Sequence, residues 1–364
     1  MERLHIAFFG LTNSGKSTLV NAICGQEVSL VSAVPGTTTD PVRKVAELPG
    51  LGPCVLIDTA GIDDASILGD ARKRLTRSVM DETDIAVVLD AADPEGLTAA
   101  LIAELQDAEI PTVVYKRDEG IPALLERLAA AAPKEEERFL TGRLVGAGSS
   151  VVLVMPQDSE APKGRLILPQ VQVLRELLDR GCAAHCCTPE ALPATLQSLS
   201  QAPDLVITDS QAFAYVNKTL PADCPLTSFS VLLAVAKGDV DAYLEGARAI
   251  DALRPGDRVL IAEACTHVPN TEDIGRVKIP ALLRKRMADQ AGHDAALQVD
   301  IAAGNDFPED LTPYRLIIHC GACVANARLV RTRIKKARRA GVPITNYGIA
   351  LAALNGILGR IAMP

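Results

Sequence analysis

Short apolar runs, each followed by a segment with helical spacing, recur along the chain. The clearest runs are LHIAFFG at 4–10, VLIDTAG at 55–61, SSVVLVMP at 149–156, PDLVITDS at 203–210, DRVLIAEAC at 257–265 and YRLIIHC at 314–320. Unbroken apolar runs of this length, bounded by turn residues, are typical of buried strands in a parallel sheet. Between them, segments such as 168–181 predict helices. There we expect an apolar face and a stop at Gly181. The expected face consists of Val171, Leu174, Leu177 and Leu178.

The pattern therefore predicts an α/β protein, and its 364 residues are too many for one small domain. We expect three α/β domains, at 1–135, 140–230 and 231–364. A charged, proline-marked connection, APKEEERF at 132–139, separates the first two. The middle segment shows no catalytic constellation, and we expect an assembly domain there. A strand end and a buried helix are expected at 345–358.

Composition narrows the setting. No run of about twenty apolar residues occurs and the N-terminus lacks a signal-peptide pattern, so we expect a cytoplasmic protein without a membrane partner. The net charge of −8 argues against a general nucleic-acid binder, although 328–339 is locally basic, which is more typical of a solvated helix face. Nine cysteines in a reducing compartment are not expected to form a disulfide framework.

A phosphate-binding loop follows the first apolar run. Residues 10–17 read GLTNSGKS, the G-x-x-x-x-G-K-S pattern, with a helical segment directly after it. Backbone N–H groups of such a loop surround phosphate oxygens, Lys16 reaches the β- and γ-phosphates, and the Ser17 hydroxyl ligates Mg²⁺. Downstream, Asp58 at a strand end is expected to hold Mg²⁺ through water, and Gly61 to move toward a γ-phosphate. Thr38 is expected to close over the metal.

These parts occur in the order of a GTPase switch. Asn13 in the loop and the segment GTTTD at 36–40 resemble the potassium-stimulated TrmE-Era group of GTPases, which implies that both hold a K⁺ ion near the phosphates. We expect Lys16, Asn13, Thr38 and Gly61 to carry hydrolysis. The expected nucleotide and Mg²⁺ contacts are Asn13, Ser14, Gly15, Lys16, Ser17, Thr18, Thr37, Thr38, Asp58, Gly61, Lys116 and Asp118.

Two departures from a GTPase pattern bear on rate and selectivity. Ile62 stands where a water-orienting glutamine is common, so hydrolysis should be slow. The base-reading motif N-K-x-D is represented by YKRD, in which Tyr115 replaces the asparagine. A helical segment begins at once after Asp118, as though the final strand and base loop of the domain were truncated. Base recognition is therefore the least complete part of the nucleotide site.

A cysteine pattern dominates the last third of the chain. One apolar run ends at Cys265, with His267 and Glu272 close behind it, and another ends at His319 and Cys320, with Cys323 following. If both strands are parallel in one sheet, their carboxyl ends meet at one edge and the three thiolates converge. A helix expected from 324 would add backbone donors.

An iron–sulfur cluster and a zinc ion both suit these ligands. A structural zinc site usually lies on short knuckles, whereas the 51 residues 268–318 separate the two histidines, so we favour the cluster. Zinc stays the alternative.

Behind a TrmE-Era-like domain, the cysteine pattern resembles the HydF family of [FeFe]-hydrogenase maturation factors. The segments DSEAPKGRLILPQVQ, PDLVITDSQA, TEDIGRVKIP and PITNYG add to the likeness, which extends over all three expected domains. The resemblance implies a GTPase domain, a small dimerisation domain and a C-terminal cluster-binding domain. It also implies a [4Fe–4S] cluster on Cys265, Cys320 and Cys323 with an exchangeable fourth position. For that position we expect Glu272 ahead of His267 and His319.

The same resemblance implies a homodimer that acts as scaffold or carrier. Its cargo would be a diiron precursor of the hydrogenase H-cluster, assembled with the radical-SAM maturases HydE and HydG and passed to the hydrogenase HydA. The alternatives are a GTP-regulated iron–sulfur redox enzyme and a tRNA-modification or translation GTPase with structural zinc. Radical-SAM chemistry is disfavoured, because the C-x-x-x-C-x-x-C triplet is absent from the sequence.

Overall fold

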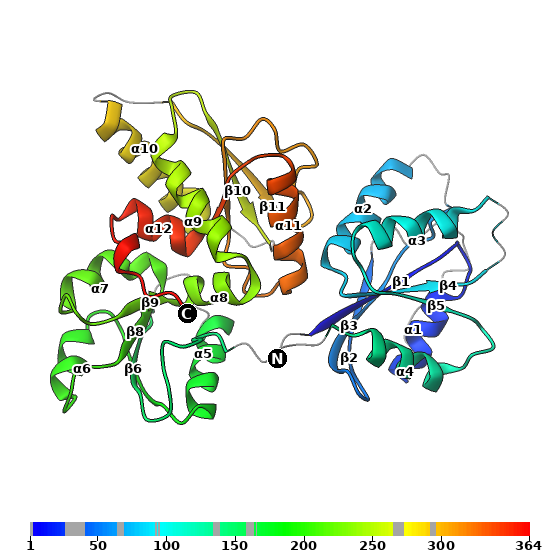
Figure 1. Ribbon diagram of the computed structural model, residues 1–364, viewed down its shortest axis with the longest axis horizontal. Helices are drawn as coiled ribbons and strands as arrows, with labels where there is room; N and C mark the ends of the chain where they lie inside the picture. The colour runs from blue at the N-terminus through cyan, green and yellow to red at the C-terminus, as the bar shows by residue number, and fades with distance from the viewer. Residues whose placement is uncertain are drawn as a thin grey trace. The chain divides into compact units, whose positions relative to one another are not determined.

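The chain forms two compact units, Met1–Glu136 and Glu137–Pro364. A computed structural model describes residues 3–25, 41–63, 69–91, 93, 95–133, 139–157, 164, 166–264, 273–291 and 296–364, with the side chains of 69–74 and 290–291 left out. Figure 1 shows the elements of each unit.

The first unit is built on a five-stranded sheet of order β2-β3-β1-β4-β5. Its strands are β1 (Leu4–Phe9), β2 (Val42–Leu48), β3 (Gly52–Asp58), β4 (Ile85–Leu89) and β5 (Thr112–Tyr115). Only β2 runs antiparallel, against β3. The helices are α1 (Lys16–Cys24), α2 (Gly69–Glu82), α3 (Leu97–Asp107) and α4 (Ile121–Ala131).

Alternation along β1 divides the core of this unit into two layers. Ile6 and Phe8 pack in the cluster that contains residues of α1 and α4, whereas Ala7 and Phe9 pack in the cluster that contains residues of α2 and α3. Successive side chains of a strand point to opposite faces, so an unbroken apolar run is what a sheet covered on both sides requires. The expectation of a buried first strand is confirmed, with helices on both faces of the sheet (Figure 1).

The second unit contains two four-stranded sheets, both wholly parallel. One has the order β7-β6-β8-β9 and the other β11-β10-β12-β13. The first comprises β6 (Ser150–Val154), β7 (Ala183–Cys187), β8 (Leu205–Thr208) and β9 (Leu226–Ser228). The second comprises β10 (Arg258–Glu263), β11 (Gln298–Ala303), β12 (Leu316–His319) and β13 (Ile344–Asn346).

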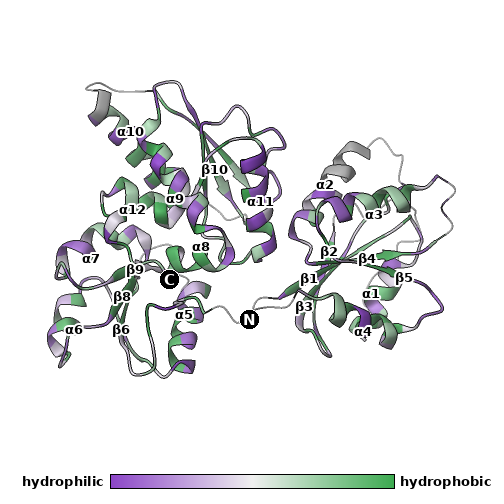
Figure 2. Ribbon diagram, in the orientation of Figure 1, coloured by the Kyte–Doolittle hydropathy of each residue, from purple (hydrophilic) through white to green (hydrophobic). Residues whose placement is uncertain are grey.

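Helices pack on these sheets and between them. They are α5 (Leu168–Asp179), α6 (Leu192–Ser198), α7 (Phe213–Thr219), α8 (Phe229–Lys237), α9 (Val240–Ala249), α10 (Ile279–Ala291), α11 (Ala327–Arg339) and α12 (Tyr347–Leu354). Single turns occur at η1 (Ser210–Ala212), η2 (Ile250–Ala252), η3 (Ile274–Lys278, a π-helix) and η4 (Leu358–Arg360). One buried cluster includes Val152 of the first sheet and Ile317 of the second, so the two sheets share a core. In Figure 2 the strands are coloured as hydrophobic and α11 as largely hydrophilic.

The buried face of α5 differs from the one expected. Val173 and Leu177 are fully buried, whereas Val171 is 46% exposed and Leu178 60% exposed. Two apolar stripes fit helical spacing in this segment, 169–173–177 and 171–174–178. The sheet covers the first stripe, because only one side of a helix can face its neighbour.

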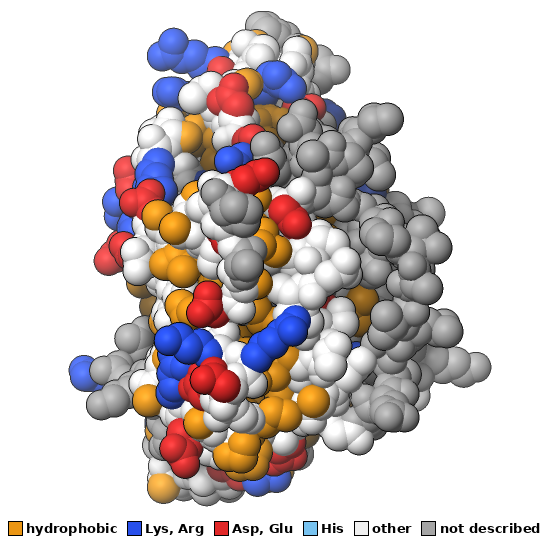
Figure 3. All heavy atoms as spheres, turned by 90° about the vertical axis from the view of Figure 1, so that its right-hand side faces the viewer, with side chains coloured by type: hydrophobic (Ala, Val, Ile, Leu, Met, Phe, Trp, Pro, Cys, Tyr) orange, Lys and Arg blue, Asp and Glu red, His pale blue; other side chains and the backbone are white. Residues whose placement is uncertain are grey.

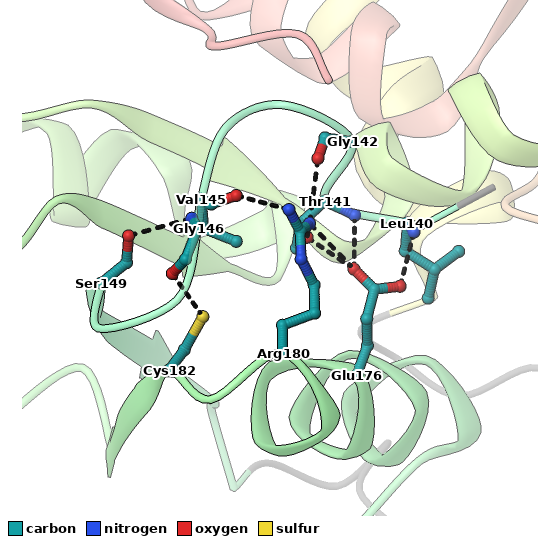
Figure 4. Close-up of polar contacts among 9 residues, drawn as sticks. All are labelled: Leu140, Thr141, Gly142, Val145, Gly146, Ser149, Glu176, Arg180 and Cys182. Carbon is teal, nitrogen blue, oxygen red and sulfur yellow. Dashed lines mark hydrogen bonds and ion pairs between the residues drawn. The ribbon is translucent and has the colours of Figure 1, made fainter. Parts of the chain in front are cut away.

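A polar network joins α5 to the loop at 140–146 (Figure 4). The Glu176 carboxylate accepts hydrogen bonds from the backbone N–H groups of Leu140 at 2.5 Å and Thr141 at 2.9 Å, and from the Thr141 hydroxyl. One turn later, Arg180 donates to the carbonyls of Gly142 at 2.9 Å and Val145 at 2.5 Å. Two side chains of one helix therefore fix the segment by which the chain enters the second unit.

The surface bears on the expected partners. Among the described residues, no helix is both long and apolar enough to cross a membrane. In the described part of the face that Figure 3 shows, acidic and basic side chains are intermingled rather than gathered into one basic patch.

Candidate nucleotide and cluster sites

The phosphate loop is held by its own backbone and by Lys16. Gly15 has a φ of 99° and Asn13 a φ of 59°, both in the left-handed region, which turns the chain from β1 into α1. The Lys16 ammonium donates hydrogen bonds to the carbonyls of Gly10 at 3.1 Å and Leu11 at 2.8 Å. The lysine therefore lies inside the curve of the loop, as the sequence pattern requires of a phosphate ligand.

Two polar atoms beside Lys16 are buried without a hydrogen-bond partner among the described residues, Ser14 Oγ and Asp58 Oδ1. Burial raises the pKa of Asp58, while a hydrogen bond from Ser17 and the charge of Lys16 oppose that shift. Burial also lowers the pKa of Lys16, against the attraction of Asp58. The structure thus brings the predicted Mg²⁺ ligands Ser17 and Asp58 together, with unsatisfied oxygen that suits a hard cation.

The segment after Asp58 lies directly on the phosphate loop. A Cβ atom added to Gly61 would be 2.1 Å from Thr12 Oγ1 and 2.6 Å from Thr12 N, so only glycine fits. The Thr12 N–H also donates to Asp63 Oδ1 at 2.5 Å. Burial tends to raise the pKa of Asp63, but the hydrogen bonds from Thr12 outweigh it and lower that pKa. Sequence reasoning identified Gly61 and missed Thr12 and Asp63.

The predicted base-reading residues Lys116 and Asp118 follow β5 and are exposed. Tyr115 is only 8% exposed and packs in the core beside α4, so its side chain does not face a base. Arg117, which the sequence did not single out, donates from Nη2 to the carbonyl of Ser14 at 3.0 Å. The base-reading segment is therefore tied to the phosphate loop by an arginine. Thr18 is exposed on the first turn of α1, and Thr37 and Thr38 lie outside the described residues.

The strands that carry the cysteine pattern are neighbours. β10 and β12 pair in parallel, with Ala262 opposite His319. The N–H groups of Ala264 and Ala322 donate to Cys320 Sγ at 3.1 Å and 3.4 Å. Sulfur that accepts backbone N–H groups is the environment of a metal- or cluster-bound thiolate, so Cys320 fits such a group. The expectation that the two strand ends meet at one sheet edge is confirmed.

The helix after Cys323 begins later than expected. Asn326 caps it by accepting from Leu329 N at 3.2 Å, and the first helical residue is Ala327 rather than 324. An asparagine side chain that accepts this hydrogen bond ends the loop and starts the helix. Cys323 consequently lies in the loop between β12 and α11 and not on the first turn.

His319 is buried and uses both ring nitrogens. Nδ1 lies 2.8 Å from the carbonyl of Cys320, which requires an Nδ1–H donor, and Nε2 accepts from Arg333 at 3.1 Å. Burial and the Arg333 charge lower the pKa of His319 to about 3, so the ring is neutral. Arg333 is 2% exposed and also donates to the carbonyls of Glu263 and Gly304, so this member of the basic stretch is not on a solvated face.

Other buried polar groups surround Cys320. Glu263 pairs with Arg276 at 2.8 Å, and the Tyr347 hydroxyl is buried with no hydrogen-bond partner among the described residues. Burial, together with the neighbouring Cys320 and Glu263, raises the pKa of Tyr347. Within the described ranges no three His, Cys, Asp or Glu side chains cluster as metal ligands. Cys265, His267 and Glu272 lie outside those ranges.

Family comparisons agree with this arrangement. The model of a 50S ribosome-binding GTPase matches residues 5–118. The hydrogen maturase F dimerization domain matches 140–238, and the hydrogen maturase F tetramerization domain matches 241–364. The chain belongs to the hydrogen maturase F family. The predicted fold class is confirmed, since an N-terminal P-loop GTPase domain of mixed α/β structure precedes the two hydrogen maturase F domains.

These domains support oligomerisation of a hydrogen maturase F chain, and a GTPase fold implies binding of GTP and Mg²⁺. Three residues of α5 in the dimerization range expose large apolar side chains, Leu168, Val171 and Leu178.

Individual relatives resemble only part of the chain. The tRNA modification GTPase MnmE of Xanthomonas oryzae pv. oryzae is 35% identical over 152 residues, which is 40% of this chain and 32% of the relative. GTPase Der of Caldicellulosiruptor saccharolyticus is 37% identical over 124 residues, 33% of this chain and 26% of the relative. The chain thus spans about a third of the length of this MnmE and about a quarter of the length of this GTPase Der.

A solved structure of Aquifex aeolicus Era bound to GDP·AlF4⁻ is 17% identical, with a TM-score of 0.28, and the match covers 85% of this chain and 97% of Era. That score is too low to support a conclusion about function.

Proposed function

We propose that this chain is a GTP-hydrolysing scaffold that holds a [4Fe–4S] cluster on Cys265, Cys320 and Cys323. Its cargo is a diiron precursor of the [FeFe]-hydrogenase H-cluster. The hydrogen maturase F domains, and the contact of Cys320 with the strand that leads to Cys265, support this function.

In the nucleotide site, Lys16 is already turned into the phosphate loop and would bind the β- and γ-phosphates. Ser17 and the unsatisfied Asp58 oxygen would hold Mg²⁺, which supplies charge neutralisation for phosphoryl transfer. The Gly61 backbone lies against the loop and would donate its N–H toward the γ-phosphate. Asn13, with Thr37 and Thr38, would hold K⁺ in place of an arginine finger.

The single observation that carries the cluster assignment is the hydrogen bond from Ala264 N to Cys320 Sγ. Ala264 directly precedes Cys265 in the sequence, so the last described residue before Cys265 contacts the Cys320 thiol. Cys323 follows three residues on, in the loop closed by Asn326. With Cys265, these two cysteines would hold a [4Fe–4S] cluster by three thiolates and would leave one iron for an exchangeable ligand.

For the fourth iron we retain Glu272 as the exchangeable ligand, because a carboxylate binds less tightly than a thiolate. His267 is the second choice. His319 is assigned a positioning role instead, since both of its ring nitrogens are engaged by Arg333 and the Cys320 carbonyl. A ligand role would require breaking the bond to Arg333.

The partners follow from the same function. The scaffold would receive its cargo from HydE and HydG and deliver it to HydA, in the cytoplasm, as a homo-oligomer. The nucleotide state would bias partner docking, with a coupling free energy of about 1–3 kcal/mol between the sites.

The experiment compares Cys320→Ala with Cys186→Ala after anaerobic reconstitution with iron and sulfide. Cys186 is an exposed cysteine of β7, in the other sheet of the unit, and serves as the matched control. We expect Cys186→Ala to bind four irons with the EPR signal of the parent and Cys320→Ala to lose both. A full cluster in Cys320→Ala, or stoichiometric zinc without iron in the parent, would refute the assignment.

A further inference from the structure

The second unit contains one βα arrangement twice. Its two sheets have the orders β7-β6-β8-β9 and β11-β10-β12-β13. In each sheet the second strand in sequence is an edge strand that pairs with the first. The pairing registers agree as well. Thr208 lies opposite Val154 and Ser228 in the first sheet, at the positions that His319, Ala262 and Asn346 occupy in the second.

The segment after each fourth strand repeats in sequence. It reads PLTSFSVLLAVAKG at 225–238 and PITNYGIALAALNG at 343–356. The strand-end residues Ser228 and Asn346 each cap the helix that follows, α8 and α12. Those helices contact at equivalent positions, since a Cβ added to Gly348 would lie 2.9 Å from the Cβ of Ser230. Contact between equivalent positions of the two copies indicates that the copies are related by an approximate two-fold axis.

Each terminal helix lies against the other copy. Helix α12 packs on η1, the turn that follows β8, and α8 packs toward the turn that follows β12. The chemistry of the two turns differs. The first copy has Asp209 where the second has Cys320, and Asp209 accepts a hydrogen bond from Gln170 at 3.0 Å. Of these two turns, only the one that α8 supports carries cysteines.

Lys237 is the residue of α8 that breaks the symmetry. It is 5% exposed, and its ammonium donates to the carbonyls of Ala322 at 3.0 Å and Ala325 at 2.8 Å. Its counterpart in the second copy is Asn355, the residue after α12, whose amide donates back to the Leu351 carbonyl of that helix at 2.7 Å. A buried lysine of one copy thus bonds the backbone of the cysteine turn of the other. At the turn without cysteines, the lysine contact from the other copy comes from Lys278 and goes to the Gln211 side chain at 2.7 Å rather than to backbone carbonyls.

The two carbonyls belong to a strained loop. Ala322 has a φ of 49°, a left-handed conformation that costs a non-glycine residue about 1 kcal/mol or more. The Ala322 N–H donates to Cys320 Sγ, and the Ala322 carbonyl is bonded to Lys237. Lys237 therefore fixes the residue that orients the thiol.

We propose that Lys237 is a positioning residue for the cluster. Lys237 holds the 321–325 loop so that Cys320 and Cys323 face one site, and its charge raises the cluster's reduction potential. This inference rests on the proposed cluster function. A positive charge in a buried setting stabilises the more negative, reduced cluster more than the oxidised one.

The test uses Lys237→Met, which keeps the length of the stem and removes the charge, and Lys218→Met as control. Lys218 is an exposed lysine at the end of α7, so the net charge of the two variants is the same. In metal-free protein, we expect amide hydrogen exchange of residues 321–326 to be about tenfold faster, or more, in Lys237→Met, since hydrogen bonds from a charged donor contribute at least that factor. After reconstitution, we expect a more negative midpoint potential by EPR-monitored titration. Lys218→Met should match the parent in both.

The inference is overturned if Lys237→Met matches Lys218→Met in exchange and in potential. If Lys237→Met is insoluble, the same measurements on Lys237→Gln decide, because the amide removes the charge with a smaller change in packing. If the parent itself takes up no cluster, the proposed function fails, and the exchange measurement alone then decides whether Lys237 holds the loop.

Discussion

Glu176→Gln is predicted to destabilise the second unit by removing the charge that holds the loop at 140–146. One carboxylate oxygen accepts from Leu140 N and the other from Thr141 N and Thr141 Oγ1. A glutamine oxygen can replace only one of the two oxygens. The amide NH₂ then faces an N–H donor, so one buried backbone donor loses its partner and the other bonds lose their ionic character (Figure 4).

The magnitude follows from those bonds. An unsatisfied buried donor costs about 1–3 kcal/mol, and two weakened charge-assisted bonds add about 1 kcal/mol, which gives about 2–4 kcal/mol in free energy of unfolding. In a unit of this size each kcal/mol shifts Tm by about 2–4 °C, so the expected decrease is on the order of 4–16 °C. Scanning calorimetry or circular dichroism measures it, provided that the transition of the second unit is resolved from that of the first.

Asp179→Asn is the matched control, because it makes the same chemical change on the same helix. Asp179 pairs with Arg175 across one turn, with side chains 54% and 75% exposed, and such pairs contribute little. We expect its Tm to stay close to that of the parent. If Glu176→Gln shifts Tm no more than Asp179→Asn, the network in Figure 4 does not stabilise the unit and the reasoning fails.

Three further predictions concern the first unit. Gly61→Ala should reduce GTP turnover by about tenfold or more with little change in nucleotide affinity, because a Cβ cannot approach Thr12 and the N–H that the γ-phosphate needs is displaced; parent-like kcat would contradict this. Asp58→Asn should raise the Tm of nucleotide-free protein at neutral pH, since a raised pKa means that ionisation opposes folding. The gain should vanish below the ordinary aspartate pKa of about 3.9, where both side chains are neutral, and a gain independent of pH would be inconsistent. Hydrolysis should be faster in K⁺ than in Na⁺ and the difference should disappear in Asn13→Ala, so equal rates in the two salts would remove the potassium proposal.

Features that depend on a few neighbouring residues were predictable. The phosphate loop follows from its glycines and Lys16, because the left-handed φ of Gly15 and the lysine's return to the Gly10 carbonyl are set within seven residues. The buried strands follow from unbroken apolar runs, since backbone N–H and C=O groups in an apolar segment must pair in a sheet or a helix. That the ends of β10 and β12 lie at one sheet edge followed from the rule that parallel strands share a carboxyl edge, whereas their direct pairing came from the structure.

The tertiary structure was needed to decide which face of a helix is buried and which partner a polar side chain contacts, because the local sequence allows more than one answer. Helix α5 has two apolar stripes, and only contact with the sheet decides that Val173 is buried and Val171 is not. The sequence offered His319 as a ligand, but Arg333, fourteen residues away, occupies its Nε2, and burial together with the Arg333 charge lowers the pKa of the ring so that it is neutral. Lys237 lies 85 positions before Ala322, and no periodicity connects them. The Lys237–Ala322 contact exists only where the two copies of the βα arrangement pack together, so its chemistry belongs to the fold.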